Sequence, residues 1–229
     1  MFYNNYDSLP AGVYQSFISR PDLHPPILNV NGTGTPGLVL FSQSGDDVHQ
    51  PACIISDHNG NIVYVHTTPD PAGCRDLNLQ TYNGTEYLTF WSGEQVHQHF
   101  SGTYYIMDNT LNITNYIETD PLGDMHEFNI VNNTALAAFY YPLAMDLTKW
   151  GGPANGRICG SGFKQVDLYT GEVIFDWKST DHFTPDVSIF TIKEGSNVNP
   201  DGSPGPWDIF HLNSIDMHPT DGARYFPSR

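Results

Sequence analysis

The 229-residue chain has few basic side chains, with 9 Lys and Arg against 25 Asp and Glu, and its formal net charge is -16. Nucleic acids and anionic membrane surfaces are bound by clustered Lys and Arg, so we predict neither as a partner. The sequence also lacks any run near the roughly 18 apolar residues that cross a membrane. An anionic small molecule must therefore be bound by a local cationic pocket, against the field of the whole chain.

Cysteine is scarce as well. The three cysteines, Cys53, Cys74 and Cys159, have no C-x-x-C spacing, which excludes the usual zinc and dithiol motifs. An odd number allows one disulfide and one free thiol, and we favour Cys53 with Cys74 as the pair.

The common cofactor and nucleophile motifs are missing, and no cofactor is predicted. The sequence has no Gly-x-Ser-x-Gly elbow, no P-loop and no dinucleotide fingerprint. His97 and His99 in "VHQHF" are spaced to share a metal ion, but the spacing indicates no third ligand, so no metal is predicted either. Asp181 and His182 resemble an acid–base dyad, and we interpret them as residues at the end of a strand.

The first twelve residues, "MFYNNYDSLPAG", lack the basic and apolar regions of a signal peptide. Glycosylation sequons nevertheless begin at four asparagines, Asn31, Asn83, Asn112 and Asn132. We take these sequons as support for a secreted glycoprotein.

Short runs of Val, Ile, Tyr, Phe and Thr alternate with Gly, Asn and Asp along most of the chain, which is typical of strands and tight turns. Helical periodicity is absent, except in the Ala-rich stretch 134–145, where helix and strand compete. The pattern predicts an all-β protein. Its hairpins turn at "HNGN", Asn83-Gly84, Asp108-Asn109, Asn132-Asn133 and Thr170-Gly171.

The hairpins also recur at a fixed interval. "DLNLQTYNGTEYLTFW" at 76 and "MHEFNIVNNTALAAFY" at 125 align about fifty residues apart, and a second hairpin follows each of them. Two hairpins make four strands, which is one blade of a β-propeller. A third opening, "WDIFHLNSIDMHP", is delayed by two expected loops, about 143–158 and 184–206. We read "GPWDIFHLNSIDMHP" as a strand that lines the central opening.

These units predict a single partial propeller domain over residues 17–229, after an N-terminal segment at 1–16. The sequence accommodates about three to four blades and stops at "RYFPSR", so we expect an incomplete ring. Because an unclosed ring leaves open sheet edges, we also expect self-association.

Five stretches, taken in order, resemble the fungal arylsulfotransferase-like proteins, a branch of the family of bacterial arylsulfate sulfotransferases. They are "SRPDLHPPILNV", "LQTYNGTEYLTFWSGE", "GDMHEFNI", "SGFKQVDLYTGEVIFDWKSTDH" and "WDIFHLNSID". The resemblance covers the N-terminal portion of the family and runs from about residue 17 to the end of the chain.

The resemblance implies a six-bladed propeller that transfers a sulfuryl group from an aryl sulfate to a phenol without a nucleotide cofactor. In the family a histidine nitrogen accepts the group, and other His, Arg and Asn side chains hold the sulfate oxygens. These residue types suit a reaction that resembles phosphoryl transfer, where positioning and electrostatic stabilisation supply most of the catalysis.

Residue by residue, the resemblance assigns His126, His211, Asn213 and Arg229 to the site. Strand alternation would point His211 and Asn213 to the same side. Arg229 follows Pro227 and Ser228, where the family has two serines. The family's sulfuryl-accepting histidine lies beyond the matched motifs.

Two other functions stay open. The propeller could bind or cyclise a small molecule in fungal secondary metabolism, or the chain could be a truncated product without activity of its own.

Overall fold

The computed structural model describes residues 2–3, 16–17, 22–45, 47–97, 99–198 and 204–227. Strands hold 52% of the residues and helices 6%, so the predicted all-β class is confirmed. No helix within the described ranges has the length and apolar character needed to span a membrane.

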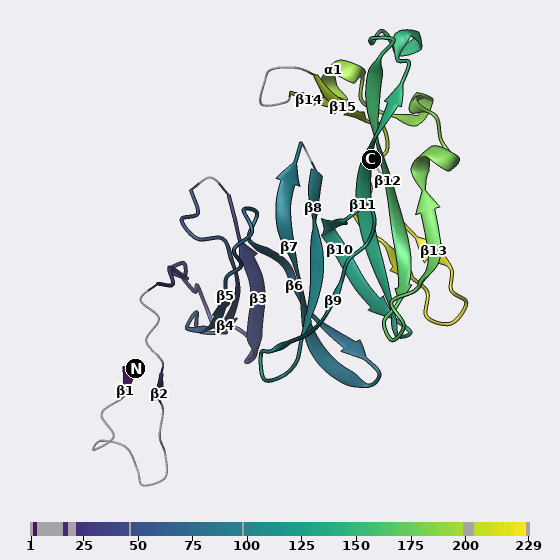
Figure 1. The fold of residues 1–229 in the computed structure, drawn as a ribbon. Helices are drawn as coiled ribbons and strands as arrows, with labels where there is room; N and C mark the ends of the chain where they lie inside the picture. Colours follow the sequence, from purple (N-terminus) through teal and green to yellow (C-terminus); the bar gives the residue numbers. More distant parts are fainter. Residues whose placement is uncertain are drawn as a thin grey trace.

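Three groups of consecutive strands form antiparallel sheets that lie side by side (Figure 1). The first group holds β3 (Leu38–Gln43), β4 (Ala52–Asp57) and β5 (Ile62–His66). The second holds β6 (Cys74–Tyr82), β7 (Thr85–Val96), β8 (His99–Met107) and β9 (Ile113–Ile117). The third holds β10 (Gly123–Val131), β11 (Thr134–Met145), β12 (Gly156–Asp167) and β13 (Val173–Lys178).

Each four-stranded group is the double hairpin predicted for a propeller blade. The described strands close no barrel, and the arrangement is that of neighbouring blades in a partial propeller. β10 meets β8 at the pair Gly102–Gly123, which joins the second blade to the third.

The first hairpin of each blade turns through residues with positive φ. Asn83 and Gly84 have φ of 48° and 74°, and Asn132 and Asn133 have φ of 49° and 61°. Asparagine and glycine tolerate this region, and two such residues in succession match the twist of the strands they join. The two predicted Asn-centred turns are confirmed.

The second hairpin of each blade turns at an aspartate. Asp108 Oδ1 accepts the backbone N–H groups of Thr110 and Asn112 at 2.9 and 3.1 Å. Asp57 and Asp167 cap the corresponding turns of the first and third groups in the same way. The turns at 57–61 and 167–172 therefore have a local cause that the sequence displays.

The apolar core lies between neighbouring sheets. Phe90, Met107 and the two half-cystines fill the space between the first and second groups. Trp91, Tyr104 and Phe128 are the largest buried side chains of the cluster between the second and third groups. Full burial of side chains of this size stabilises the fold by about 2–3 kcal/mol each, which holds the blades in register.

Three local predictions were wrong in extent. The stretch 205–219 is not one strand: β15 (Pro204–Asp208) ends before His211, and β16 (Asp216–Met217) resumes later and pairs with β17 (Arg224–Tyr225). β15 runs parallel to β12, with Asp208 beside Cys159. The register of β15 with β12 ends at this pair.

The loop expected at 143–158 is also shorter, because β11 continues to Met145 and β12 begins at Gly156. The stretch 134–145 is a strand. The loop expected at 184–206 contains ordered elements, α1 (Ile192–Gly195), β14 (Ser196–Val198) and the start of β15.

Cys53 and Cys74 form a disulfide, and Cys159 is free and buried, so the favoured pairing is confirmed. The disulfide joins β4 to β6 and thereby the first blade to the second. In the predicted N-terminal segment, β1 (Phe2–Tyr3) pairs with β2 (Ser16–Phe17). Residues 4–15 lie outside the described ranges, and the domain boundary at 16/17 stays a prediction.

Candidate functional site

His126 and His211, both predicted site residues, lie close together. His126 is on β10, His211 follows β15, and their ring centroids are 5.7 Å apart. Asn213 is exposed, because the irregular backbone after β15 removes the alternation that would have aligned it with His211. Arg229 lies outside the described residues. The structure thus brings together two of the four.

A third imidazole, His99 at the start of β8, completes the cluster. Its ring centroid is 5.6 Å from that of His211, and its ring stacks on Tyr140 at 3.7 Å and 12°. Because β8 belongs to the second blade and β10 and β11 to the third, the cluster spans the junction between two blades.

Two of the imidazoles are each bound by an aspartate of the same segment. His126 Nδ1 hydrogen-bonds to Asp124 Oδ1, and His211 Nδ1 hydrogen-bonds to Asp208 Oδ2 at 2.5 Å. Asp124 is fully buried and accepts a second bond from the Phe100 N–H at 3.0 Å. A carboxylate on Nδ1 places the proton there in the neutral ring and leaves Nε2 as the reactive nitrogen.

His99 differs from the other two because neither of its ring nitrogens has a hydrogen-bond partner in the described part of the chain. Burial lowers the pKa of His99 to about 4 and outweighs the opposing effect of Asp208 and Asp124. His99 is therefore a neutral imidazole at neutral pH.

The Asp76 carboxyl on β6 borders the cluster. Burial, followed by the nearby Glu127 carboxylate, raises the pKa of Asp76 to about 7. The His126 ring and a backbone hydrogen bond from Phe128 act in the opposite direction. Asp76 can therefore exchange a proton near neutral pH.

Matching side chains of successive blades hold the inner strands in place. Trp91 and Tyr140 occupy equivalent positions in the two aligned repeats. The Trp91 indole donates to the Gly123 carbonyl at 2.9 Å, and the Tyr140 hydroxyl donates to the Leu212 carbonyl at 2.6 Å. Each bond fixes the backbone next to the following blade's histidine.

A comparison with protein-family models finds one match, to the model described as arylsulfotransferase (ASST), over residues 76–227. The match covers well over half of the chain and includes His99, His126 and His211. The chain belongs to the arylsulfotransferase family. Neither the curated proteins nor the solved structures contain a match to it.

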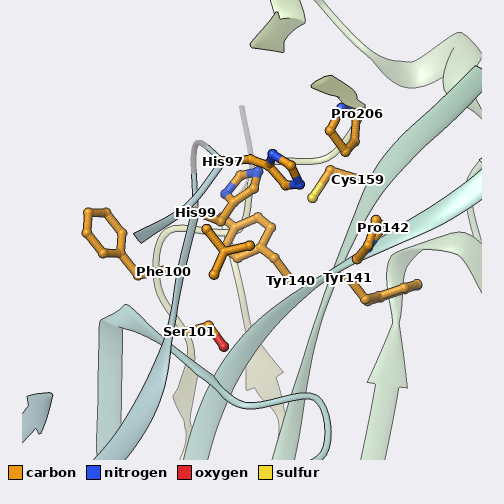
Figure 2. A pocket seen from close by; sticks show the side chains of 10 residues that line it. His97, His99, Phe100, Ser101, Tyr140, Tyr141, Pro142, Cys159 and Pro206 are labelled. Atoms are coloured by element: carbon orange, nitrogen blue, oxygen red, sulfur yellow. The ribbon is translucent and has the colours of Figure 1, made fainter. Parts of the chain in front are cut away.

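An apolar pocket of about 170 Å³ opens beside the cluster of this arylsulfotransferase-family chain (Figure 2). His99 and Tyr140 line it together with Phe100, Pro142 and Pro206. Apolar cavities of about 150 Å³ take up benzene in other proteins, so the pocket has the size and lining for one aromatic ring.

Cys159 also lines the pocket, and it is not a reactive group. Burial raises the pKa of the Cys159 thiol far above its ordinary value, and the Asp208 and Asp124 carboxylates raise it further. The thiol contributes apolar surface to the pocket instead of a nucleophile.

Sequence analysis of the arylsulfotransferase-family motifs missed Asp124, Asp208 and the involvement of His99. The aspartates were detectable, because "CRDLN", "GDMHEF" and "PWDIFHL" each carry one near the opening of a repeat, at Asp76, Asp124 and Asp208. His99 gave no comparable signal, since it reaches the cluster from the neighbouring blade. The structure does not support an acid–base role for Asp181 and His182. Both residues are exposed, and His182 stacks on Trp177.

Proposed function

We propose that the chain takes part in transfer of a sulfuryl group from an aryl sulfate donor to a phenolic acceptor. The observation that carries the proposal is the convergence of His99, His126 and His211 at a blade junction, within the part of the chain that matches the arylsulfotransferase model. The adjacent pocket fits the aryl group of a donor or an acceptor.

His126 and His211 are assigned to the sulfate oxygens and to proton transfer. Each ring presents Nε2 while an aspartate binds Nδ1, so each can donate as an imidazolium or accept as a neutral base. The resemblance assigns the sulfuryl-accepting histidine to a position beyond the matched motifs, and neither His126 nor His211 is given that role.

The chemistry balances in two halves. In the first, the aryl O–S bond of the donor breaks as an imidazole N–S bond forms, and the departing phenolate takes a proton from a second imidazolium. In the second, the acceptor phenol gives its proton to an imidazole and its oxygen takes the sulfuryl group from nitrogen. In the transition state, negative charge spreads over the equatorial oxygens of the sulfuryl group, and hydrogen-bond donors that are already in position stabilise it. We assign this role to the imidazoles of the two Asp–His pairs.

The test is release of 4-nitrophenolate from 4-nitrophenyl sulfate with phenol as acceptor. We expect the His211→Ala chain to lose at least ~100-fold in turnover, because general acid–base groups contribute that much. The control is His218→Gln, since His218 is half exposed and pairs only with Asp221 among the described residues. Absence of turnover in a version of the protein that includes the sulfuryl-accepting histidine, or full turnover by His211→Ala in that version, contradicts the proposal.

We also propose that the protein passes through the secretory pathway. The Cys53–Cys74 disulfide supports an oxidising compartment, and the four sequon asparagines are exposed. A mass loss on treatment of the native protein with an N-glycosidase is expected, and an unchanged mass argues against glycosylation.

A further inference from the structure

His99, Asp208 and His211 form a compact group that the proposed function uses only in part. One ligand atom from each lies within 4.8 Å of the other two. His99 Nε2 is 3.8 Å from Asp208 Oδ2, and that oxygen is 2.5 Å from His211 Nδ1. The side chains of His99, Asp208 and His211 are 6%, 11% and 14% exposed, so water has little access to them.

Several polar atoms of this group lack a hydrogen-bond partner among the described residues. Both ring nitrogens of His99 and the Oδ1 atom of Asp208 are buried without a hydrogen-bond partner in the ranges that the structure describes. A buried polar group left unpaired costs about 1–3 kcal/mol. Unpaired atoms in two adjoining buried side chains indicate that a ligand absent from the polypeptide binds at least one of them.

The charge of the surroundings indicates the sign of that ligand. Asp124 and Asp208 are buried carboxylates, and in the described part of the chain their ion-pair partners are histidines alone. The charge of the surroundings therefore favours a cation at this site.

We propose that His99, Asp208 and His211 bind one divalent transition-metal ion, with Zn²⁺ as the best fit. Two imidazole nitrogens and one carboxylate oxygen are a common donor set for such ions. Tetrahedral Zn²⁺ separates its ligand atoms by about 3.3 Å. To reach this spacing, the distance from His99 Nε2 to Asp208 Oδ2 must shorten from 3.8 Å and that from Asp208 Oδ2 to His211 Nδ1 must lengthen from 2.5 Å, each by less than 1 Å. The ion would replace the proton that Asp208 and His211 share.

The site leaves a coordination position for a substrate. His99 also lines the apolar pocket, so a fourth ligand can enter from there, either a water molecule or a sulfate oxygen. The bound ion would give the sulfate group a positive partner. The metal site stands on its own geometry and does not depend on sulfuryl transfer.

This inference replaces the pairing of His97 with His99 considered from sequence. His97 is exposed and does not belong to the group. The missing ligands come instead from residues more than one hundred positions later, which sequence spacing could not indicate.

Metal binding is measured directly, on a chain produced without a polyhistidine tag and stripped with EDTA. After buffer exchange we expect about one Zn²⁺ per chain by elemental analysis, and visible absorption bands when Co²⁺ replaces Zn²⁺. His99→Phe keeps the ring that stacks on Tyr140, and Asp208→Asn keeps the shape of the carboxylate. Each should weaken Zn²⁺ binding at least ~100-fold in competition with a chromophoric chelator.

His97→Phe is the matched control, because it makes the same substitution two residues away and should keep the affinity of the unmodified chain. Near-ultraviolet circular dichroism checks that each variant is folded. The proposal is overturned if the unmodified chain binds no Zn²⁺, or if His99→Phe and Asp208→Asn bind as tightly as His97→Phe.

The two proposals fail separately. Zinc bound without release of 4-nitrophenolate would reject sulfuryl transfer and keep the metal site. Turnover that persists in EDTA, together with unaltered affinity in the two variants, would reject the metal site and keep sulfuryl transfer.

Discussion

The Asp76 carboxyl lies near the Glu127 carboxylate, at the edge of the histidine cluster. Titration of Asp76 should change the free energy of unfolding with pH. Its folded-state pKa of about 7 lies above the ordinary value of 3.8. The folded chain therefore binds the proton more tightly than the unfolded chain. The resulting stability is fully present below pH 3.8 and is lost as the pH rises through 7.

Asp76→Asn should remove this dependence, because an amide keeps an acceptor for Phe128 and carries no proton to lose. Between pH 5 and pH 8 the unmodified chain should lose about 2 kcal/mol more stability than the variant. Urea unfolding at the two pH values measures the difference. Equal losses in the two proteins would mean that Asp76 titrates normally.

At the scale of the strand, Gly102 and Gly123 allow β8 and β10 to meet. A Cβ atom at Gly123 would lie 2.2 Å from the Tyr104 ring, and one at Gly102 would lie 2.2 Å from the Ser92 carbonyl oxygen. Gly123→Ala should therefore destabilise the chain by about 2–3 kcal/mol through overpacking.

Gly37→Ala is the control for this strand contact, since no atom lies within 4 Å of the Cβ position there. Its unfolding midpoint in urea should stay within experimental error of the unmodified chain. A Gly123→Ala chain of unchanged stability would show that the blades can separate without cost.

The disulfide joins two blades across a sequence separation of 21 residues. Loop-closure entropy for a loop of this length is worth about 3 kcal/mol at 25 °C. A reducing agent should lower the free energy of unfolding by about that amount in the unmodified chain and leave a Cys53→Ser, Cys74→Ser variant unchanged. Cys159 is a free thiol in both proteins, so any effect of the reducing agent on it is the same in the two measurements.

Local turn chemistry explains why so much of the fold could be predicted. The Asn and Asp residues at the hairpins act on neighbours within five positions, so the sequence displays both the turn and its cause. The pairing of β15 with β12 joins residues far apart in the sequence, and the position of His99 depends on packing between blades. Interactions between distant residues leave no such local pattern, and these were the features that prediction missed.

At the scale of the molecule, we propose that the chain associates with itself through two exposed strand edges, those of β5 and β13. Val63 on β5 and Ile174 on β13 are exposed by 58% and 52%, on strands that lack a further neighbour within their own sheets. Unpaired edges with apolar side chains favour association.

Sedimentation velocity over a range of concentrations should show dimers or larger species. A Val63→Lys, Ile174→Lys double variant should associate at least ~10-fold more weakly. Leu143→Lys is the control, because Leu143 is 41% exposed on β11, a strand that is paired with β10 and with β12. Monomers at all concentrations would argue that the edges are protected.

The hydrogen bonds from Trp91 and Tyr140 have an evolutionary consequence. Both are accepted by main-chain carbonyl groups, that of Gly123 on β10 and that of Leu212 after β15, so the bonds themselves do not depend on the side chains of neighbouring residues. The chemistry of the inner strands is thereby free to diverge while the spacing between blades is conserved. Homologues that keep an aromatic donor at these two positions can be expected to vary their histidines and still assemble.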